Sequence, residues 1–386
     1  MVNSAHPPNS PQRGVYGESS CVTATLLAQR GHSSMITPAE VPGGTGLTIG
    51  VGFDTLADPT FDWDAFANLL ERAGAAGVAL QVGRPELLLF PWNAHRDEWA
   101  PGVSADYDPV ARALGALASI EADLEITHVI EVTAPRHIQR EPASAGVFAD
   151  GASSEQLPSI SSLARGKFGA DLVALCREVS DRYQPARISL TSLILEASFG
   201  DSDRELFSEM TGLRDFPRDE AGRADALDPL VVAWRTQLLT ELIAQCASVT
   251  LPGTLIDIEM RVNWDDPGAD RAESGHAYAA VLDTGNAITL WDSFGLNDEP
   301  PTYSAQLADG LAARFGVGER ERITISIGLW GRLGDAAGAT ISPFDLRIAI
   351  ENTWGRVGHI GVTPASLIGA EHWRVLAELR ESRVGL

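Results

Sequence analysis

The sequence predicts an α/β fold, a single (β/α)8 barrel, and three observations support this prediction. Eight apolar segments of strand length recur along the 386 residues, most of them separated by a segment with helical periodicity. Every strand after the first is entered from a helix, which implies parallel pairing through right-handed crossovers. The chain is 44% hydrophobic, enough for one large core. The expected strands are residues 47–54, a segment that starts at 77, and residues 124–133, 188–203, 254–264, 287–295, 322–331 and 359–367.

Polar and helical segments complete the expected domain organisation. Residues 1–43 are rich in Pro, Ser and Gly and have no lasting hydrophobic period, so we expect a flexible or loosely packed tail before a barrel domain at 44–386. Ser342 as a cap with Pro343 at the first helical position marks the start of one helix. The expected helices are residues 63–73, 109–122, 169–182, 229–246, 277–282, 304–315, 342–354 and 371–379.

Charge and cysteine content limit the partners and the location. A formal net charge of -23 argues against nucleic acid or an anionic membrane as a partner. No apolar run approaches the length of a membrane span, and no basic start followed by an apolar core marks a secretion signal, so a cytoplasmic location is expected. Cys21, Cys176 and Cys246 are widely spaced and odd in number, which is typical of reduced thiols. The sequence predicts no oligomeric state.

Two expected strands carry acidic residues that an aliphatic strand does not need. The stretch 188–203 is aliphatic until it delivers Glu196 to a loop. In the strand at 254–264, aliphatic residues alternate with Asp257, Glu259 and Arg261, so one face of the strand carries three charges. A charged face in a strand packed on both sides is costly unless the groups pair or have a function. Asp257 lies two residues deeper than Glu259 and is expected to have a structural role.

The loops after the strands form the catalytic face of a barrel, and charged residues gather there. Carboxylates around one mouth push each other's pKa values apart, which is what glycoside hydrolysis requires of its proton donor and its ionised carboxylate. The residues expected at this mouth are Asp54, Arg84, Glu86, Glu131, Glu196, Glu259, Arg261, Asp292 and Trp330.

Aromatic residues at the same strand ends favour a carbohydrate as the substrate. Trp92, Trp264, Trp291 and Trp330 fall at or just beyond four strand ends, and His95 lies in the polar, aromatic loop after the second strand. Tryptophan offers a broad apolar face with a hydrogen-bonding edge, which suits a sugar ring. We expect these residues, with Asp54, Arg84, Glu86, Arg261 and Asp292, to bind the substrate.

Other chemistries have weaker signals. The histidines show no metal-ligand spacing, so neither a metal nor a cofactor is expected. No GxSxG motif is present, and Cys176 falls inside a predicted helix, which argues against serine or cysteine hydrolysis. The fragment around Gly50 and Gly52 lacks the rest of a dinucleotide-binding fingerprint.

Several phrases of the sequence resemble a known group of proteins. They are SLILEASFGDSDRELFSEMTG, IEMRVNWDDP, LWDSFG, ISIGLWGR and VTPASLIGAEHW. Over roughly residues 47–380 the chain resembles the uncharacterised glycoside-hydrolase-like TIM barrels of bacteria, relatives of a large clan with a catalytic acid at the end of strand four. The resemblance implies that Glu196 is the acid/base. It also implies a glutamate nucleophile at the end of strand seven, where this chain has Trp330 and Gly331.

These observations predict a glycosidase that acts on an oligosaccharide or glycoside. Glu196 is expected to protonate the glycosidic oxygen, and Glu259 to attack the anomeric carbon or to activate a water molecule. Asp54 and Asp292 are the alternatives for the second carboxylate. Two other functions stay open: a carbohydrate-binding barrel without catalysis, and a metal-dependent lyase or isomerase on a sugar acid.

Overall fold

The computed structural model describes residue 41 and residues 44–120, 123–332, 334 and 338–384. These residues fall within one compact unit, Pro38–Leu386. Apart from Val41, the tail expected at residues 1–43 lies outside the described residues.

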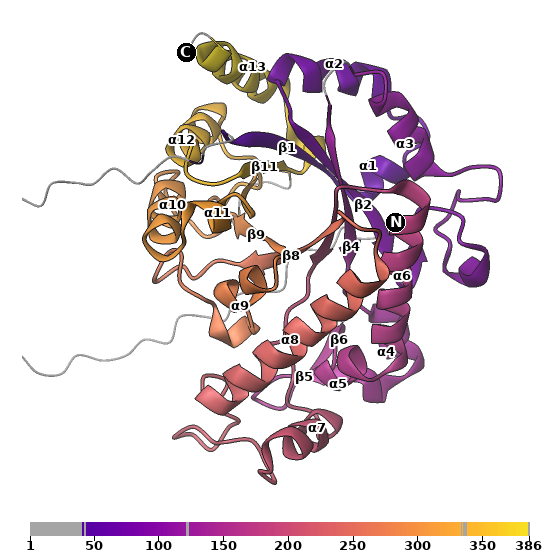
Figure 1. Ribbon diagram of the computed structural model, residues 1–386, viewed down its shortest axis with the longest axis vertical. Helices are drawn as coiled ribbons and strands as arrows, with labels where there is room; N and C mark the ends of the chain where they lie inside the picture. Colours follow the sequence, from indigo (N-terminus) through magenta and orange to yellow (C-terminus); the bar gives the residue numbers. More distant parts are fainter. Residues whose placement is uncertain (1–40, 42–43, 121–122, 333, 335–337, 385–386) are drawn as a thin grey trace, which may run out of the picture. The chain divides into compact units, whose positions relative to one another are not determined.

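Eight parallel strands close into a barrel, which confirms the predicted fold (Figure 1). Each strand pairs with its neighbours in chain order, and the last pairs with the first through partners such as Ile360 and Leu47. The strands are β1 Gly46–Val51, β2 Gly77–Arg84, β4 Glu125–Glu131, β7 Arg187–Thr191, β8 Leu255–Arg261, β9 Ala287–Asp292, β10 Ile323–Gly328 and β11 His359–Thr363.

Helices surround the barrel and connect its strands (Figure 1). The α-helices are α1 Phe53–Ala57, α2 Trp63–Ala73, α3 Pro109–Leu117, α4 Pro135–Arg140, α5 Ile160–Ala164, α6 Lys167–Tyr183, α7 Asp201–Thr211, α8 Pro229–Val249, α9 Tyr278–Asp283, α10 Tyr303–Arg314, α11 Val317–Arg320, α12 Pro343–Thr353 and α13 Ala370–Val384. The short elements are β3 Leu87–Leu88, the hairpin β5 Ala145–Val147 with β6 Ser153–Pro158, and the 3-10 helices η1 Asn93–Glu98, η2 Pro142–Ser144, η3 Ala272–Ser274 and η4 Ala365–Leu367.

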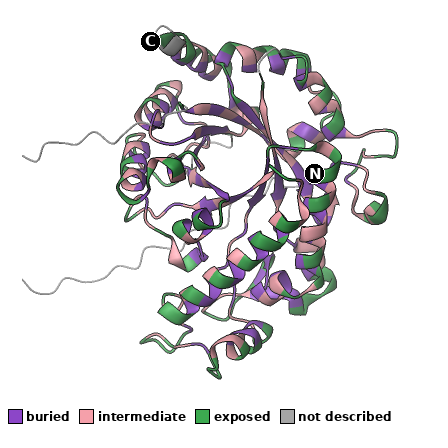
Figure 2. Cartoon of the chain, viewed as in Figure 1, coloured by how far each residue is buried: buried purple, intermediate pink, exposed green. Residues whose placement is uncertain are grey.

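The core lies between the barrel wall and the helices. On β8, Ile256, Ile258 and Met260 are at most 1% exposed and belong to this core. The helices bury the faces that they turn towards the strands and expose the opposite faces (Figure 2). The alternation predicted for β8 is therefore present, and its charged residues face the barrel interior.

Ionic and hydrogen-bonded groups fill the interior at the amino-terminal end of the strands. Arg187 on β7 reaches across the barrel to His359 on β11, with 2.7 Å between Nη2 and Nε2, and forms an ion pair with Glu125. The Asp257 carboxylate accepts a hydrogen bond of 2.6 Å from the Ser189 hydroxyl. Asp257 therefore has the structural role that its position in the sequence suggested, and we call this network the floor of the barrel.

Strand β7 is much shorter than the predicted stretch 188–203. It ends at Thr191, because Ser192 adopts a left-handed backbone conformation with φ of 59°. Leu193 and Leu195 are 1% and 3% exposed, so these apolar residues are buried in an irregular loop that looks like a strand in the sequence. Glu196 consequently lies in this loop, five residues after the strand.

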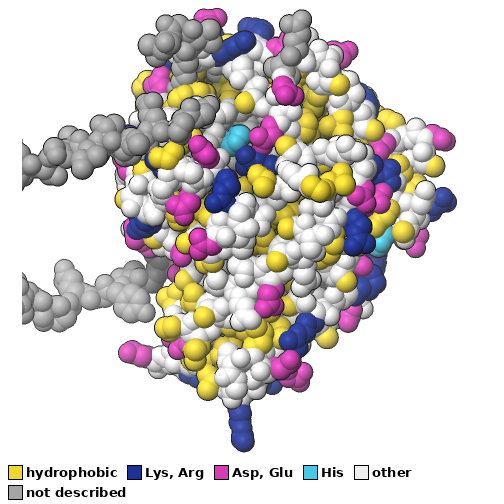
Figure 3. All heavy atoms as spheres, in the orientation of Figure 1, with side chains coloured by type: hydrophobic (Ala, Val, Ile, Leu, Met, Phe, Trp, Pro, Cys, Tyr) yellow, Lys and Arg dark blue, Asp and Glu magenta, His cyan; other side chains and the backbone are white. Residues whose placement is uncertain are grey.

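The surface carries both signs of charge. Acidic and basic side chains lie interspersed on the face drawn in Figure 3, and many of them form ion pairs, such as Arg314 with Asp266. In the part of the chain that the structure describes, no helix is both long enough and apolar enough to cross a membrane.

Candidate active site

Glu131, Thr191 and Glu259 form a row inside the barrel at the carboxyl-terminal end of β4, β7 and β8. The register pairs Glu131 with Thr191, and it pairs Leu190 with Ile258, which places Thr191 beside Glu259. Neighbouring strands are about 4.8 Å apart, so the Cα atoms of the two glutamates are roughly 10 Å apart. Both side chains point into the interior, where their carboxyl groups can approach one ligand.

Glu259 is the protonatable member of this row. Burial raises the pKa of its carboxyl to about 7. The charges of Asp257 and Glu131 raise this pKa further, whereas hydrogen bonds from the Thr191 hydroxyl and the Trp291 indole oppose the rise. The Glu259 carboxyl therefore holds a proton up to about neutral pH, beside the Trp291 indole.

Glu131 has partners that favour its negative charge. The Thr133 hydroxyl donates a hydrogen bond of 2.8 Å to Oε1, and Nη1 of Arg84 lies 3.4 Å from Oε2. The Glu131 side chain is 19% exposed, so it stays accessible from the interior. The row thus combines an ion-paired carboxylate with a protonated carboxyl.

Arg84 reaches Glu131 because β2 contains a bulge. The register of β2 against β4 shifts between Gln81 and Gly83. Gly83 has φ of 132°, and a Cβ atom there would lie 2.3 Å from the Leu87 carbonyl oxygen, so the position requires glycine. The extra residue reverses the alternation and turns Arg84 inward, whereas a regular strand would have turned it towards the helices.

Glu86 stands behind Arg84 and does not belong to the row. Its side chain is 5% exposed, and its Oε1 lies 3.4 Å from Nε of Arg84. The same carboxylate accepts hydrogen bonds from the backbone amides of Arg136 and His137 at the start of α4, at 2.9 and 2.6 Å. Glu86 therefore supports Arg84 and fixes the beginning of α4.

Glu196 belongs to a second cluster, next to the row. Its Oε1 accepts hydrogen bonds from Nη1 of Arg261 at 2.8 Å and from the Ser274 hydroxyl at 2.7 Å. The fully buried guanidinium of Arg235 hydrogen-bonds Ser198 in the same loop, at 2.8 Å. The structure thus brings Glu196 together with Arg261 and leaves Glu259 to other partners.

Asp292 does not face the barrel interior, and Asp54 lies beyond the end of its strand. Asp292 is fully buried on the helix side of β9, where it accepts a hydrogen bond from Ser304 of α10. Burial raises the pKa of Asp292 to about 7. Asp54 is exposed in the first turn of α1, because β1 ends at Val51. Asp292 therefore lacks the position at the mouth that was expected from the sequence, whereas Asp54 follows the carboxyl-terminal end of β1.

The tryptophans differ in their surroundings. Trp291 contacts Glu259 in the interior. Trp264 packs against Tyr303 with ring centroids 4.4 Å apart, and the Trp330 ring lies against Gly328 at the end of β10. All three tryptophans are partly exposed. Trp92 stacks on His95 in the loop after β3, with ring centroids 3.9 Å apart.

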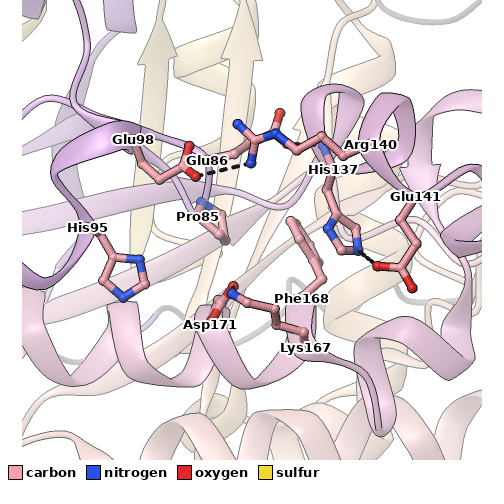
Figure 4. Close-up of a pocket in the computed structure, with 10 residues that line it drawn as sticks. All are labelled: Pro85, Glu86, His95, Glu98, His137, Arg140, Glu141, Lys167, Phe168 and Asp171. Carbon is pink, nitrogen blue, oxygen red and sulfur yellow. Dashed lines mark hydrogen bonds and ion pairs between the residues drawn. The ribbon is translucent and has the colours of Figure 1, made fainter.

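A surface pocket of about 370 Å³ lies beside this loop (Figure 4). Its walls contain the ion pair of Arg140 with Glu98 at 3.2 Å, and Nε2 of His137 lies 3.9 Å from Oε2 of Glu141. Glu86 lines the pocket and also contacts Arg84. Among the described residues, no group of three or more His, Cys, Asp or Glu side chains is placed to hold a metal ion.

Glu131 and Thr191 are the residues that sequence reasoning left without a role. Glu131 was placed at the mouth as the end of the third strand, and nothing in the sequence linked it to Glu259. The signal that could have linked them is the common alternation of three consecutive barrel strands, which puts Glu131, Thr191 and Glu259 on one face.

Comparisons with known proteins agree with the fold. No family model matches the chain, and no curated protein sequence is significantly similar to it. Solved structures of glycoside hydrolases resemble it. The β-galactosidase from the psychrophilic Marinomonas ef1 has a TM-score of 0.62 at 11% identity, over 89% of this chain and 61% of that one. The PgaB (BpsB) glycoside hydrolase domain from Bordetella bronchiseptica has a TM-score of 0.61 at 13% identity, over 87% of this chain and 98% of that one.

The catalytic domain of the β-amylase from Paenibacillus polymyxa has a TM-score of 0.58 at 10% identity, over 90% of this chain and 99% of that one. At such low identities the likeness establishes the barrel fold. It also agrees with the resemblance to glycoside-hydrolase-like barrels that the sequence indicated.

Proposed function

We propose that this protein is a glycoside hydrolase that acts on an oligosaccharide or glycoside through two carboxyl groups, those of Glu259 and Glu131. The observation that carries the proposal is the contrast between neighbouring groups: Glu259 has a pKa of about 7, and Glu131 is ion-paired with Arg84. Two carboxyls whose environments favour opposite protonation states are what glycosidic cleavage needs.

Each carboxyl has one task in the proposed reaction. Glu259 transfers its proton to the glycosidic oxygen as the bond to the anomeric carbon breaks, so that the leaving group departs as a neutral alcohol. Glu131 either attacks the anomeric carbon or takes a proton from the water molecule that does. The backbone spacing of roughly 10 Å is compatible with either route, because side chains converge inside the barrel.

Glu131 is a better second carboxylate than Glu196 for a physical reason. Burial is the main cause of the raised pKa of Glu259, and the charge of Glu131, two strands away on the same face, adds a smaller rise. Glu196 already uses Oε1 to bind Arg261 and Ser274. We therefore assign Glu196 a role in holding the loop after β7 and the side chain of Arg261, and we assign the reaction to the row.

The aromatic residues support a sugar as the substrate. Trp291 lies against Glu259, and the partly exposed Trp264 and Trp330 follow the ends of β8 and β10. Their faces can cover the C–H groups of pyranose rings while hydroxyls bond to Arg84 or Arg261.

The test is turnover of a panel of aryl glycosides and oligosaccharides by the wild type and by Glu259→Gln. We expect the variant to lose about 100-fold or more in kcat, the size of a general acid's contribution, and to keep its affinity for sugar in calorimetry. Glu205→Gln, an exposed position on α7, is the matched control. Full activity in Glu259→Gln would refute the assignment, and sugar binding by a wild type without turnover would indicate a carbohydrate-binding barrel.

A further inference from the structure

The Arg84 side chain lies between Glu86 and Glu131 and contacts both carboxylates. Its Nη1 lies 3.4 Å from both Glu131 Oε2 and the Thr133 hydroxyl, and its Nε lies 3.4 Å from Glu86. The Arg84 side chain is 20% exposed, so its charge acts in partly dehydrated surroundings. A charge there is weakly screened and has a strong effect on a carboxylate in contact with it.

We infer that Arg84 is a positioning residue: through its contact with Glu131 it helps to keep the proton shared by the two carboxyls on Glu259, where burial already favours it. Only the catalytic consequence rests on the proposed function. The distribution of the proton between the two carboxyls is a property of the folded protein.

Arg84 is the cation that contacts the row, since Arg261 is paired with Glu196. Glu259 faces the acidic groups of Asp257 and Glu131. Arg261, on the same face of β8, is paired with Glu196. In the part of the chain that the structure describes, Arg84 is the basic side chain within ion-pair distance of Glu131. Without its charge, Glu131 would keep the hydrogen bond from the Thr133 hydroxyl but would have no cation in contact.

Glu86 holds the guanidinium of Arg84 in position. The buried Glu86 carboxylate is anchored by two backbone amides of α4, so it offers the guanidinium a fixed partner. The contacts of Arg84 with Glu131 and Thr133 are long, at 3.4 Å, and a small displacement would break them. The Arg84 guanidinium therefore connects Glu86, which lines the pocket in Figure 4, with Glu131 of the row.

The experiment follows the carboxyl carbons of glutamate by NMR in the full chain labelled with [13Cδ]glutamate, from pH 4 to pH 9. Glu131→Gln and Glu259→Gln assign the two signals. In the wild type the Glu259 signal titrates in one step near pH 7. In Arg84→Met we expect Glu131 to take part of the proton, so that both signals follow a shared two-step curve.

Two variants control for charge and for shape. Arg140→Gln removes a charge from the neighbouring pocket and leaves Glu131 untouched, so it should keep the wild-type curves. Arg84→Lys restores the positive charge and should recover the single step at Glu259. If Arg84→Met does not fold, Glu86→Gln, which loosens Arg84, should produce the two-step curve in part.

Unchanged titration of Glu259 in folded Arg84→Met would overturn the inference, and so would an equal effect of Arg140→Gln. The measurement needs no substrate. If the titration changes as expected but the wild type hydrolyses no glycoside, the proposed function is refuted and the inference stands. If the wild type is an active glycosidase but Arg84→Met has the same titration curves as the wild type, the inference is refuted and the proposed function stands.

Discussion

Arg261 forms an ion pair with Glu196 at 2.8 Å and not with Glu259, although Glu259 lies only two residues earlier on the same face of β8. Glu196 and Glu259 therefore have different electrostatic surroundings. Glu196 has a cation in direct contact, whereas burial dominates at Glu259 and raises its pKa to about 7.

The pH dependence of the reaction should report Glu259. A general acid is active only when protonated, so kcat/KM should fall as pH rises through about 7, the pKa of Glu259 in the free protein. The measurement is the pH–rate profile of the wild type between pH 4 and pH 9. A profile whose descending limb lies well above pH 8 would argue that another group donates the proton.

Substitution of the two candidate partners should separate their roles. Glu131→Gln should lower kcat about 100-fold or more, because it removes the ionised carboxylate of the reaction. Glu196→Gln should keep most of the activity and lose about 1 kcal/mol of stability, because it weakens a partly exposed ion pair with Arg261. Both are measured by steady-state kinetics and urea denaturation. The opposite ranking of the two activities would return the catalytic role to Glu196, as the sequence alone suggested.

Asp292 should make the folded state less stable as pH rises from acidic to neutral. Burial raises its pKa from 3.8 to about 7, so the folded state holds a proton that the unfolded state releases at lower pH. The free energy of unfolding should therefore fall as pH rises from about 4 to about 7. Asp292→Asn cannot ionise and should lose stability less steeply between pH 5 and pH 8 in denaturant titrations. The contribution of Asp292 is absent if both proteins show the same slope.

Two helical glycines should respond oppositely to alanine. A Cβ atom at Gly310 in α10 would lie 1.9 Å from the Pro267 carbonyl oxygen. Gly310→Ala should therefore destabilise the fold by about 2 kcal/mol or more. Gly115 in α3 has no atom within 4 Å of such a Cβ. Gly115→Ala should stabilise the helix by about 0.5–1 kcal/mol. Thermal unfolding of both variants measures the difference.

The barrel could be predicted because its signals repeat. Eight aliphatic segments and the helices between them fix a parallel closed sheet, and the alternation on β8 shows which side chains face inward. The same alternation could have excluded Asp292. It follows Trp291 directly, and two consecutive residues of a strand cannot both face the interior.

The site was harder to predict because it depends on departures from regular strands. Ser192 ends β7 early, so Glu196 lies in a loop instead of at the end of a strand. The bulge at Gly83 turns Arg84 inward. Such local backbone choices depend on contacts made after folding, such as that between Gly83 and Leu87, and a single sequence has no regular pattern that announces them.

The floor of the barrel limits how a ligand can travel. The contact between Arg187 and His359 crosses the interior, and Asp257 is closed in beneath Glu259. A ligand of Glu259 must therefore enter and leave at the loop end of the strands, because the described residues block the route along the barrel axis. A long polymer cannot thread past Glu259, so whatever reaches this carboxyl arrives as a chain end or lies across the opening, and it leaves by the way it came.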